Sequence, residues 1–200
     1  MQLLTDPDSF FAERASDPDW LLPTLVVLGN AAFGAVGVWY LLDFSMRGIE
    51  SGVTTIPLAI GVGTAVVTPL VLWAVYAGVF HGLSAFFDGD GSFSRTLYLS
   101  GWGYLPSLVG SLAVAVAFYY AAQAVPPAAS IQELGAVQRQ IQNHQYVQWA
   151  NWLGVALTLW QGVLWTYAVR HARDLSVRQA ALVVALPILV SVGLSLNSLL

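Results

Sequence analysis

The 200-residue sequence contains no cysteine and no lysine, and charged side chains make up only 9% of it. The absence of cysteine excludes disulfides, thiolate catalysis and thiolate metal sites. The formal net charge of −4 argues against a nucleic-acid partner. An ordinary soluble domain carries roughly 25% charged residues, so the shortage of charge separates this chain from the soluble class.

The few charges are also unevenly placed, and five windows contain none: 20–42, 51–87, 96–132, 140–169 and 179–200. A helix needs about 20 apolar residues to cross a hydrocarbon core of roughly 30 Å, so each window is long enough. A soluble protein with five buried helices would need polar helix faces, which these windows lack. The sequence therefore predicts an all-α integral membrane bundle in one domain, 1–200, with spans at about 20–42, 53–80, 97–124, 149–169 and 179–200.

Two Asp-Pro-Asp steps, at 6–8 and 17–19, precede the first apolar window. Asp is a preferred N-cap, Pro is tolerated at the first helical position, and a second acid suits the positive end of the helix dipole. The first step predicts a short interfacial helix, "DSFFAERA", whose Phe10 and Phe11 dip into the headgroup layer; a frayed polar tail is the alternative. The second step predicts the start of the first span. This acidic N-terminus is unlike a cleavable signal peptide.

A Gln-rich stretch at 130–148 differs from the rest of the chain. Ile131, Leu134, Val137 and Ile141 recur at three- and four-residue spacing, which is typical of an amphipathic helix. We expect this helix to lie on the external face and to lead into the fourth span.

Arginine counts on alternate sides of the spans predict the orientation, because cytoplasmic loops carry an excess of basic residues. One side holds Arg14, Arg95, Arg170, Arg173 and Arg178, and the other holds Arg47 and Arg139. We therefore expect a cell-membrane protein with a cytoplasmic N-terminus and an external C-terminus. Arg170, Arg173 and Arg178 are candidates for recruiting partners and for contact with anionic lipid headgroups.

No Asp, Glu, Arg or His residue lies in the five predicted spans. Ion-coupled transporters and intramembrane proteases need such residues, so both classes are disfavoured. The chain also has no HExxH, GxSxG or Walker-type motif. We expect no enzymatic activity, no catalytic residue and no cofactor.

The third window carries small residues four apart, at Gly103, Ser107, Ser111 and Ala115, and Pro106 lies near its start. Such stripes let helix backbones approach closely in lipid. We interpret this stripe as a packing seam within the chain, with a contact between copies of the chain as the alternative.

The segment "DGDGS", residues 88–92, is similar to the head of a calcium loop. A calcium loop continues with a third acid and a Glu at position twelve, whereas Ser92 and Leu99 stand at those places. We therefore predict a glycine-rich turn built on Gly89 and Gly91, and no metal site. An enzyme with a metal held by histidine and aspartate is the alternative; its candidate ligands are His81, Asp88, Asp90, His171 and Asp174.

Several segments in this order resemble the Yip-domain family, five-span membrane proteins named for interaction with Ypt/Rab GTPases, and in particular its prokaryotic branch. The segments are "DPDSFF", "VFHGLSAFF", "DGDGSFSRTLYLSGWGYLPSLV" and "RHARDLSVRQAALVVALP". The most telling part is Gly89 to Pro106, a glycine-rich turn followed by Gly-aromatic-Gly-x-x-Pro. The resemblance implies a five-helix bundle with the N-terminus inside and the C-terminus outside. Eukaryotic members resemble trafficking and membrane-shaping scaffolds without known catalysis.

Eukaryotic members of that family carry a long cytoplasmic N-terminal region for GTPase contact, and about twenty residues precede the first predicted span here. We therefore do not expect GTPase binding. Our leading hypothesis is a non-enzymatic scaffold that contacts the lipid bilayer and recruits a protein partner or a second copy of itself. The alternative is a small transporter or channel subunit for a neutral solute, in which Pro57, Pro69 and Pro106 break the lining helices.

Overall fold

The computed structural model describes residues 2–197, and within them every regular element is helical. The elements are α1 (Gln2–Thr5), α2 (Pro7–Ser16), α3 (Leu21–Ser45), α4 (Ser51–Ser84), the 3-10 helix η1 (Ala85–Phe87), α5 (Phe93–Trp102), α6 (Leu105–Gln123), α7 (Ile131–Gln142), α8 (Gln145–Arg173) and α9 (Val177–Asn197). Five helices in this part of the chain, α3, α4, α6, α8 and α9, are long and apolar enough to cross a membrane. The predicted five-span helical class is confirmed.

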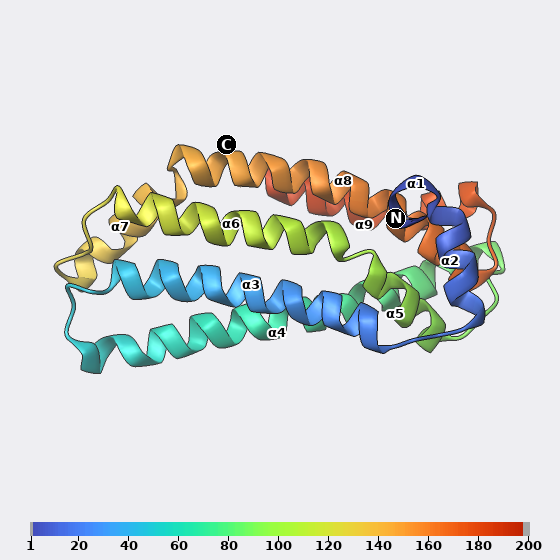
Figure 1. Cartoon of the computed structure of the whole chain (residues 1–200), viewed down its shortest axis with the longest axis horizontal. Coiled ribbons are helices and arrows are strands. Elements are labelled where there is room, and N and C mark those ends of the chain that lie inside the picture. Colours follow the sequence, from blue (N-terminus) through green and yellow to red (C-terminus); the bar gives the residue numbers. More distant parts are fainter. Residues whose placement is uncertain (1, 198–200) are drawn as a thin grey trace.

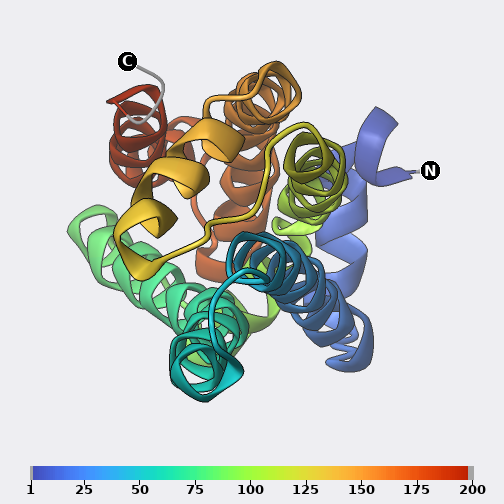
Figure 2. The same cartoon turned by 90° about the vertical axis from the view of Figure 1, so that its left-hand side faces the viewer.

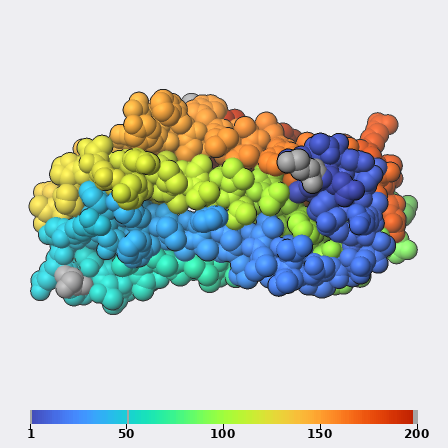
Figure 3. Space-filling model, viewed as in Figure 1, coloured from blue at the N-terminus to red at the C-terminus, as the bar shows by residue number. Residues whose placement is uncertain are grey.

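The five long helices run side by side along the long axis of the molecule (Figure 1). Helices α1, α2 and α5 gather at one end, which we call the α2 end, and α7 lies at the other, the α7 end. Seen from the α7 end, α7 lies across the bundle and α4 slants as it runs away from the viewer (Figure 2). The space-filling view shows α1 and α2 covering one end of the face formed by α3, α6 and α8 (Figure 3).

Large apolar side chains cover the outside of the long helices, as a bilayer-facing surface requires. Ile56, Leu189 and Leu194 are among the most exposed of them. In α4, no residue of the most apolar stretch is buried. This helix therefore depends on lipid for much of its packing.

The two Asp-Pro-Asp steps fold differently from each other. Asp6 caps α2 as predicted, because its carboxylate accepts the backbone N–H of Ser9 at 3.1 Å. The expectation for the second step is wrong at Asp17, which ends α2 and does not begin the first span. Helix α3 begins only at Leu21, and the Asp19 carboxylate accepts its backbone N–H at 2.9 Å.

The predicted third span, 97–124, is wrong at its start, because the chain breaks at residues 103–104 into α5 and α6. Pro106 lies in the first turn of α6, where its missing N–H costs nothing. Gly103 lies against the Trp165 indole of α8, and a Cβ at this position would overlap the ring. The third span is therefore α6 alone.

Helix α5 is held at the α2 end by two indole N–H donors. Trp73 of α4 donates to the Leu97 carbonyl at 2.8 Å, and Trp165 of α8 donates to the Ser100 carbonyl at 2.9 Å. Each carbonyl accepts a local hydrogen bond as well, Leu97 from the Ser100 hydroxyl and Ser100 from the Gly103 N–H. The two tryptophans thereby fix the angle between α5 and the bundle.

The predicted amphipathic helix is confirmed as α7, whose Val137 and Ile141 are buried against α3, α6 and α8. It is separate from the fourth span, because the chain turns at residues 143–144 before α8 begins. Helix α8 starts four residues earlier than expected and continues to Arg173. Helix α9 matches the fifth predicted span as far as Asn197, and the expected residues 198–200 lie outside the described residues.

Candidate functional site

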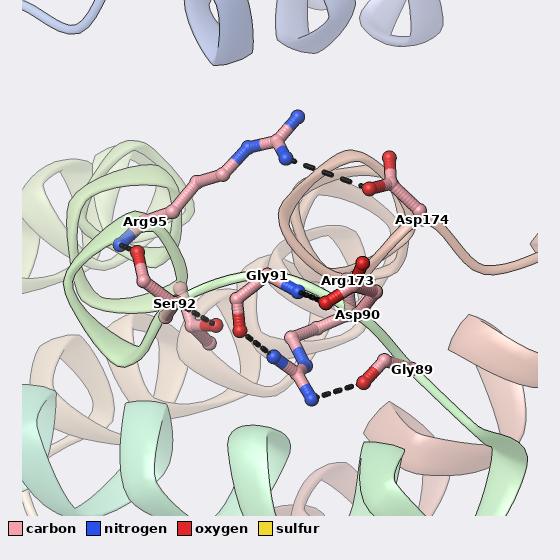
Figure 4. Close-up of polar contacts among 8 residues, drawn as sticks. Gly89, Asp90, Gly91, Ser92, Arg95, Arg173 and Asp174 are labelled. Atoms are coloured by element: carbon pink, nitrogen blue, oxygen red, sulfur yellow. Dashed lines mark hydrogen bonds and ion pairs between the residues drawn. The ribbon is translucent and has the colours of Figure 1, made fainter.

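The strongest polar cluster of the α2 end joins the α4–α5 turn, residues 88–92, to the end of α8. Arg173 is only 5% exposed, and its guanidinium donates three hydrogen bonds. One goes to the Ser84 hydroxyl at 2.7 Å, and the others go to the Gly89 and Gly91 carbonyls. In return, the Asp90 N–H donates to the Arg173 carbonyl at 3.0 Å (Figure 4). Turn and helix end therefore hold each other in place.

No carboxylate of the described residues pairs with Arg173 within ion-pair distance. Its charge is compensated by two carbonyls, one hydroxyl and the negative end of the α8 dipole. The nearby ion pair of Arg95 with the exposed Asp174, 3.6 Å long, lies outside this network. Figure 4 shows it on the outer side of the turn.

Glycine is required at Gly91 of the turn. Its φ of +112° lies in the region that side chains disfavour, and a Cβ would overlap the carbonyl oxygen of Ala172. Asp88 also has positive φ, at 54°, which Asp tolerates better than most residues. The sequence prediction of a glycine-rich turn is confirmed at these positions.

A second polar contact fastens α2 to α8. The Asp8 carboxylate accepts a hydrogen bond from His171 Nε2 at 2.6 Å and from Arg170 Nη1 at 2.5 Å. The bond from His171, assisted by Arg170, lowers the pKa of Asp8 below its usual value. Asp8, the second acid of the first Asp-Pro-Asp step, therefore links the first turn of α2 to the distant end of α8.

Phe10 and Phe11 do not enter the headgroup layer, and that expectation is wrong. Both rings are buried among Tyr98, Leu99 and residues of α8. The Arg14 guanidinium covers the Phe10 ring at 3.6 Å from its centroid. Because α2 packs against α5 and α8, its aromatic face contacts protein and not lipid.

The three candidate arginines of the α8–α9 region have three different environments. Arg173 is buried, and Arg170 directs its charge to Asp8. Arg178 is exposed and makes no ion pair or side-chain hydrogen bond with the described residues. The expectation that all three face lipid headgroups is therefore wrong for Arg173, and Arg178 is the one left free.

The small-residue stripe faces the interior of the bundle. Ser107 donates to the Gln161 carboxamide of α8, and Ser111 donates to Asn30 Oδ1 of α3 at 2.7 Å. Ala115 approaches Gly37 of α3 closely enough that a Cβ on the glycine would lie 3.2 Å from it. These contacts place the stripe between α3, α6 and α8.

The alternative metal site is not assembled in the described part of the chain, where no three His, Asp or Glu side chains gather. His171 is engaged with Asp8, and Asp174 pairs with Arg95. The Asp90 carboxylate accepts the adjacent N–H of Gly91 at 2.7 Å. Three of the five candidate ligands thus serve separate contacts, while His81 Nδ1 is buried without a hydrogen-bond partner among the described residues.

Sequence reasoning missed the partners of these residues. Ser84 and Asp8 lie 89 and 162 positions from the arginines that they bind. One signal was present: both lie beside a helix end that meets the arginine-rich end of α8. Trp165, which fits against Gly103, carried no comparable signal.

These features define a multi-pass helical membrane protein, most of whose charged contacts among the described residues gather at one end of the bundle. The chain belongs to the Yip1 domain family, which matches residues 1–197. It is also similar to Uncharacterized protein MJ0794 of Methanocaldococcus jannaschii, with 29% identity over 124 residues, 60% of this chain and 88% of that protein. The resemblance to a prokaryotic branch of this family is confirmed. No solved structure matches the chain.

Proposed function

We propose that the protein is a non-enzymatic scaffold that recruits a partner at its α2 end. One observation carries this proposal: Arg173 holds the α4–α5 turn rigidly, so that the turn's outer residues are presented in a fixed arrangement. Asp88 and Asp90 are exposed there, and Phe86, just before the turn, is 84% exposed. A partner with basic side chains around an apolar pocket fits this combination.

The proposal includes the orientation predicted from arginine counts, with the α2 end in the cytoplasm and the protein in the cell membrane. Because the chain has no cysteine, single cysteines report sidedness directly. We expect a cysteine at Ser94 to be shielded from a membrane-impermeant maleimide in intact cells, and one at Gln140 on α7 to react. If the cysteine at Ser94 reacted and the one at Gln140 were shielded, the protein would have the opposite orientation.

Recruitment is tested by placing a photo-crosslinking residue at Phe86 in native membranes, with the same probe at Gln140 as the control position. We expect a discrete, saturable adduct from Phe86 alone. It should be lost in Arg173→Met, which frees the turn, and in the Asp88→Asn, Asp90→Asn double variant, which removes its charge. Equal capture at both positions, or capture that ignores these changes, contradicts recruitment by the turn.

Anionic lipid is a second partner that we propose, through Arg178, since each exposed arginine near an anionic surface contributes about 1 kcal/mol. Arg178→Gln should weaken binding of the purified protein to anionic headgroups at low salt. The same substitution at Arg139, on α7, provides the matched control.

The alternative of a transporter or channel subunit for a neutral solute has one observation in its favour, a cavity between the long helices that is lined partly by polar side chains. Five spans do not divide into two equal inverted halves, which many transporters have. We therefore keep the scaffold as the proposed function.

A further inference from the structure

A cavity of about 230 Å³, partly open to the outside of the bundle, lies between α3, α4, α6, α8 and α9. None of the described residues that line it carries a charge. Its polar lining includes Asn30, Tyr76, Tyr104, Ser107, Gln161 and Ser191. It adjoins a second cavity of about 330 Å³ through Ser107 and Thr158, which line both.

Two side-chain carboxamides that line the cavity, those of Asn30 and Gln161, each have a polar atom that is not hydrogen-bonded within the described part of the chain. Asn30 and Gln161 are 7% and 5% exposed. Each carboxamide is bonded at one atom by a serine, Ser111 and Ser107 respectively. A serine hydroxyl can donate to the oxygen or accept from the nitrogen. In either orientation, one polar atom of each carboxamide has no partner among the described residues.

Tyr104 adds a third unused group. Its side chain lines the cavity, it is 5% exposed, and its hydroxyl has no hydrogen-bond partner. An unpaired buried polar group costs about 1–3 kcal/mol, so the buried Tyr104 hydroxyl, beside two carboxamides with spare hydrogen-bonding atoms, is unusual for a region that serves packing alone. By contrast, Tyr76 and Ser191 satisfy each other across the cavity at 2.7 Å and join α4 to α9.

We propose that this cavity is a binding site for a small uncharged solute with hydroxyl or carbonyl oxygens. The oxygens of such a molecule accept from the two carboxamides and pair with the Tyr104 hydroxyl. A charged ligand is disfavoured because no lining residue compensates its charge in a low-dielectric interior. The space equals that of roughly eight water molecules in the liquid, which suits a molecule of the size of glycerol. This site is independent of the α4–α5 turn.

The experiment uses the full chain in lipid nanodiscs and saturation-transfer NMR, with glycerol and urea as probes. Glycolate, which resembles them in size but carries a charge, is the negative probe. We expect saturable binding of glycerol or urea at millimolar concentration, and no competition by glycolate. Absence of saturable binding by both neutral probes overturns the proposal, and so does equal competition by glycolate.

Two variants locate the binding. Tyr104→Phe removes only an unpaired hydroxyl, so the fold should be kept, and we expect binding about fivefold to tenfold weaker, the loss of one hydrogen bond. Gln161→Met removes both polar atoms at nearly constant length and should weaken binding further. Tyr120→Phe, at an exposed tyrosine of α6, should change nothing. Unchanged binding in the variant that combines Tyr104→Phe and Gln161→Met places the probes elsewhere and overturns the proposal.

Discussion

Replacing Arg173 by methionine removes the guanidinium that joins the α4–α5 turn to α8 while keeping a side chain of similar length. Three acceptors lose their donor, namely the Ser84 hydroxyl and the Gly89 and Gly91 carbonyls. A hydrogen bond to a charged group contributes about 1.5–3 kcal/mol. Both glycines are half-buried, so water replaces part of what is lost. We expect a decrease of about 3 kcal/mol in the free energy of unfolding.

The assay is thermal unfolding of the purified protein in one fixed detergent, followed by helical circular dichroism. On the scale of about 2–4 °C per kcal/mol for a chain of this length, the midpoint should fall by about 6–12 °C. The unfolding midpoint of Arg173→Lys should lie between those of the parent and Arg173→Met. An ammonium group lacks the planar fork with which the guanidinium reaches three acceptors at once. The control is Arg178→Met on the exposed side of the same region, expected within about 0.5 kcal/mol of the parent.

Two results would refute this reasoning. If Arg173→Met were as stable as Arg178→Met, the hydrogen bonds to the turn would contribute nothing net. If it were more stable than the parent, the desolvation cost of burying Arg173 without a carboxylate would exceed the stabilisation from its hydrogen bonds to the carbonyls.

Three further changes test other contacts by the same unfolding assay. Gly91→Ala should cost about 2–4 kcal/mol through positive φ and overlap with the α8 backbone, whereas Gly82→Ala, in open space within α4, should be neutral or stabilising. Gly103→Ala should cost about 1–3 kcal/mol, since its Cβ meets a buried indole; an unchanged midpoint would show that the indole moves aside. Asp8 has a lowered pKa in the fold, so its contribution is present above its unfolded pKa of about 3.9 and is lost as pH falls through the lower folded value. Asp8→Asn should therefore lower stability at pH 7, by less than about 1 kcal/mol because the carboxylate is 42% exposed, and the difference should shrink below about pH 4.

The number of spans was predictable because charged side chains are too costly in hydrocarbon, so each span appears in the sequence as a window without charge. The boundaries of the third span were not, because a window without charge does not distinguish a span from a helix packed at its end. Gly103 and Pro106 mark the break between α5 and α6, but the same residue types occur inside α4, where Pro57 and Pro69 leave the helix continuous. Tertiary contact with Trp165 decides between the two outcomes.

The candidate site was predictable in its local parts alone. The turn geometry at Gly91 and the cap at Asp6 depend on neighbours in sequence, and both were foreseen. The sequence predicts that Phe10 and Arg173 meet lipid, because an aromatic pair and a basic cluster near a span usually lie at the membrane interface. Their burial depends on α2 folding back onto α5 and α8, which no local pattern encodes.

The spanning helices are very unequal in length, and this has a consequence for how the protein responds to its surroundings. At about 1.5 Å per residue, the 19 residues of α6 measure about 28 Å and the 34 residues of α4 about 51 Å. An upright α6 matches a hydrocarbon layer of about 30 Å, while an apolar helix as long as α4 stays covered only by leaning. In a thinner bilayer, the tilt of α4 would increase before the tilt of α6 changed. Changes in membrane thickness would thus be felt first along the unburied apolar stretch of α4, whose other end is anchored in the core by Ala77, Phe80 and Ser84.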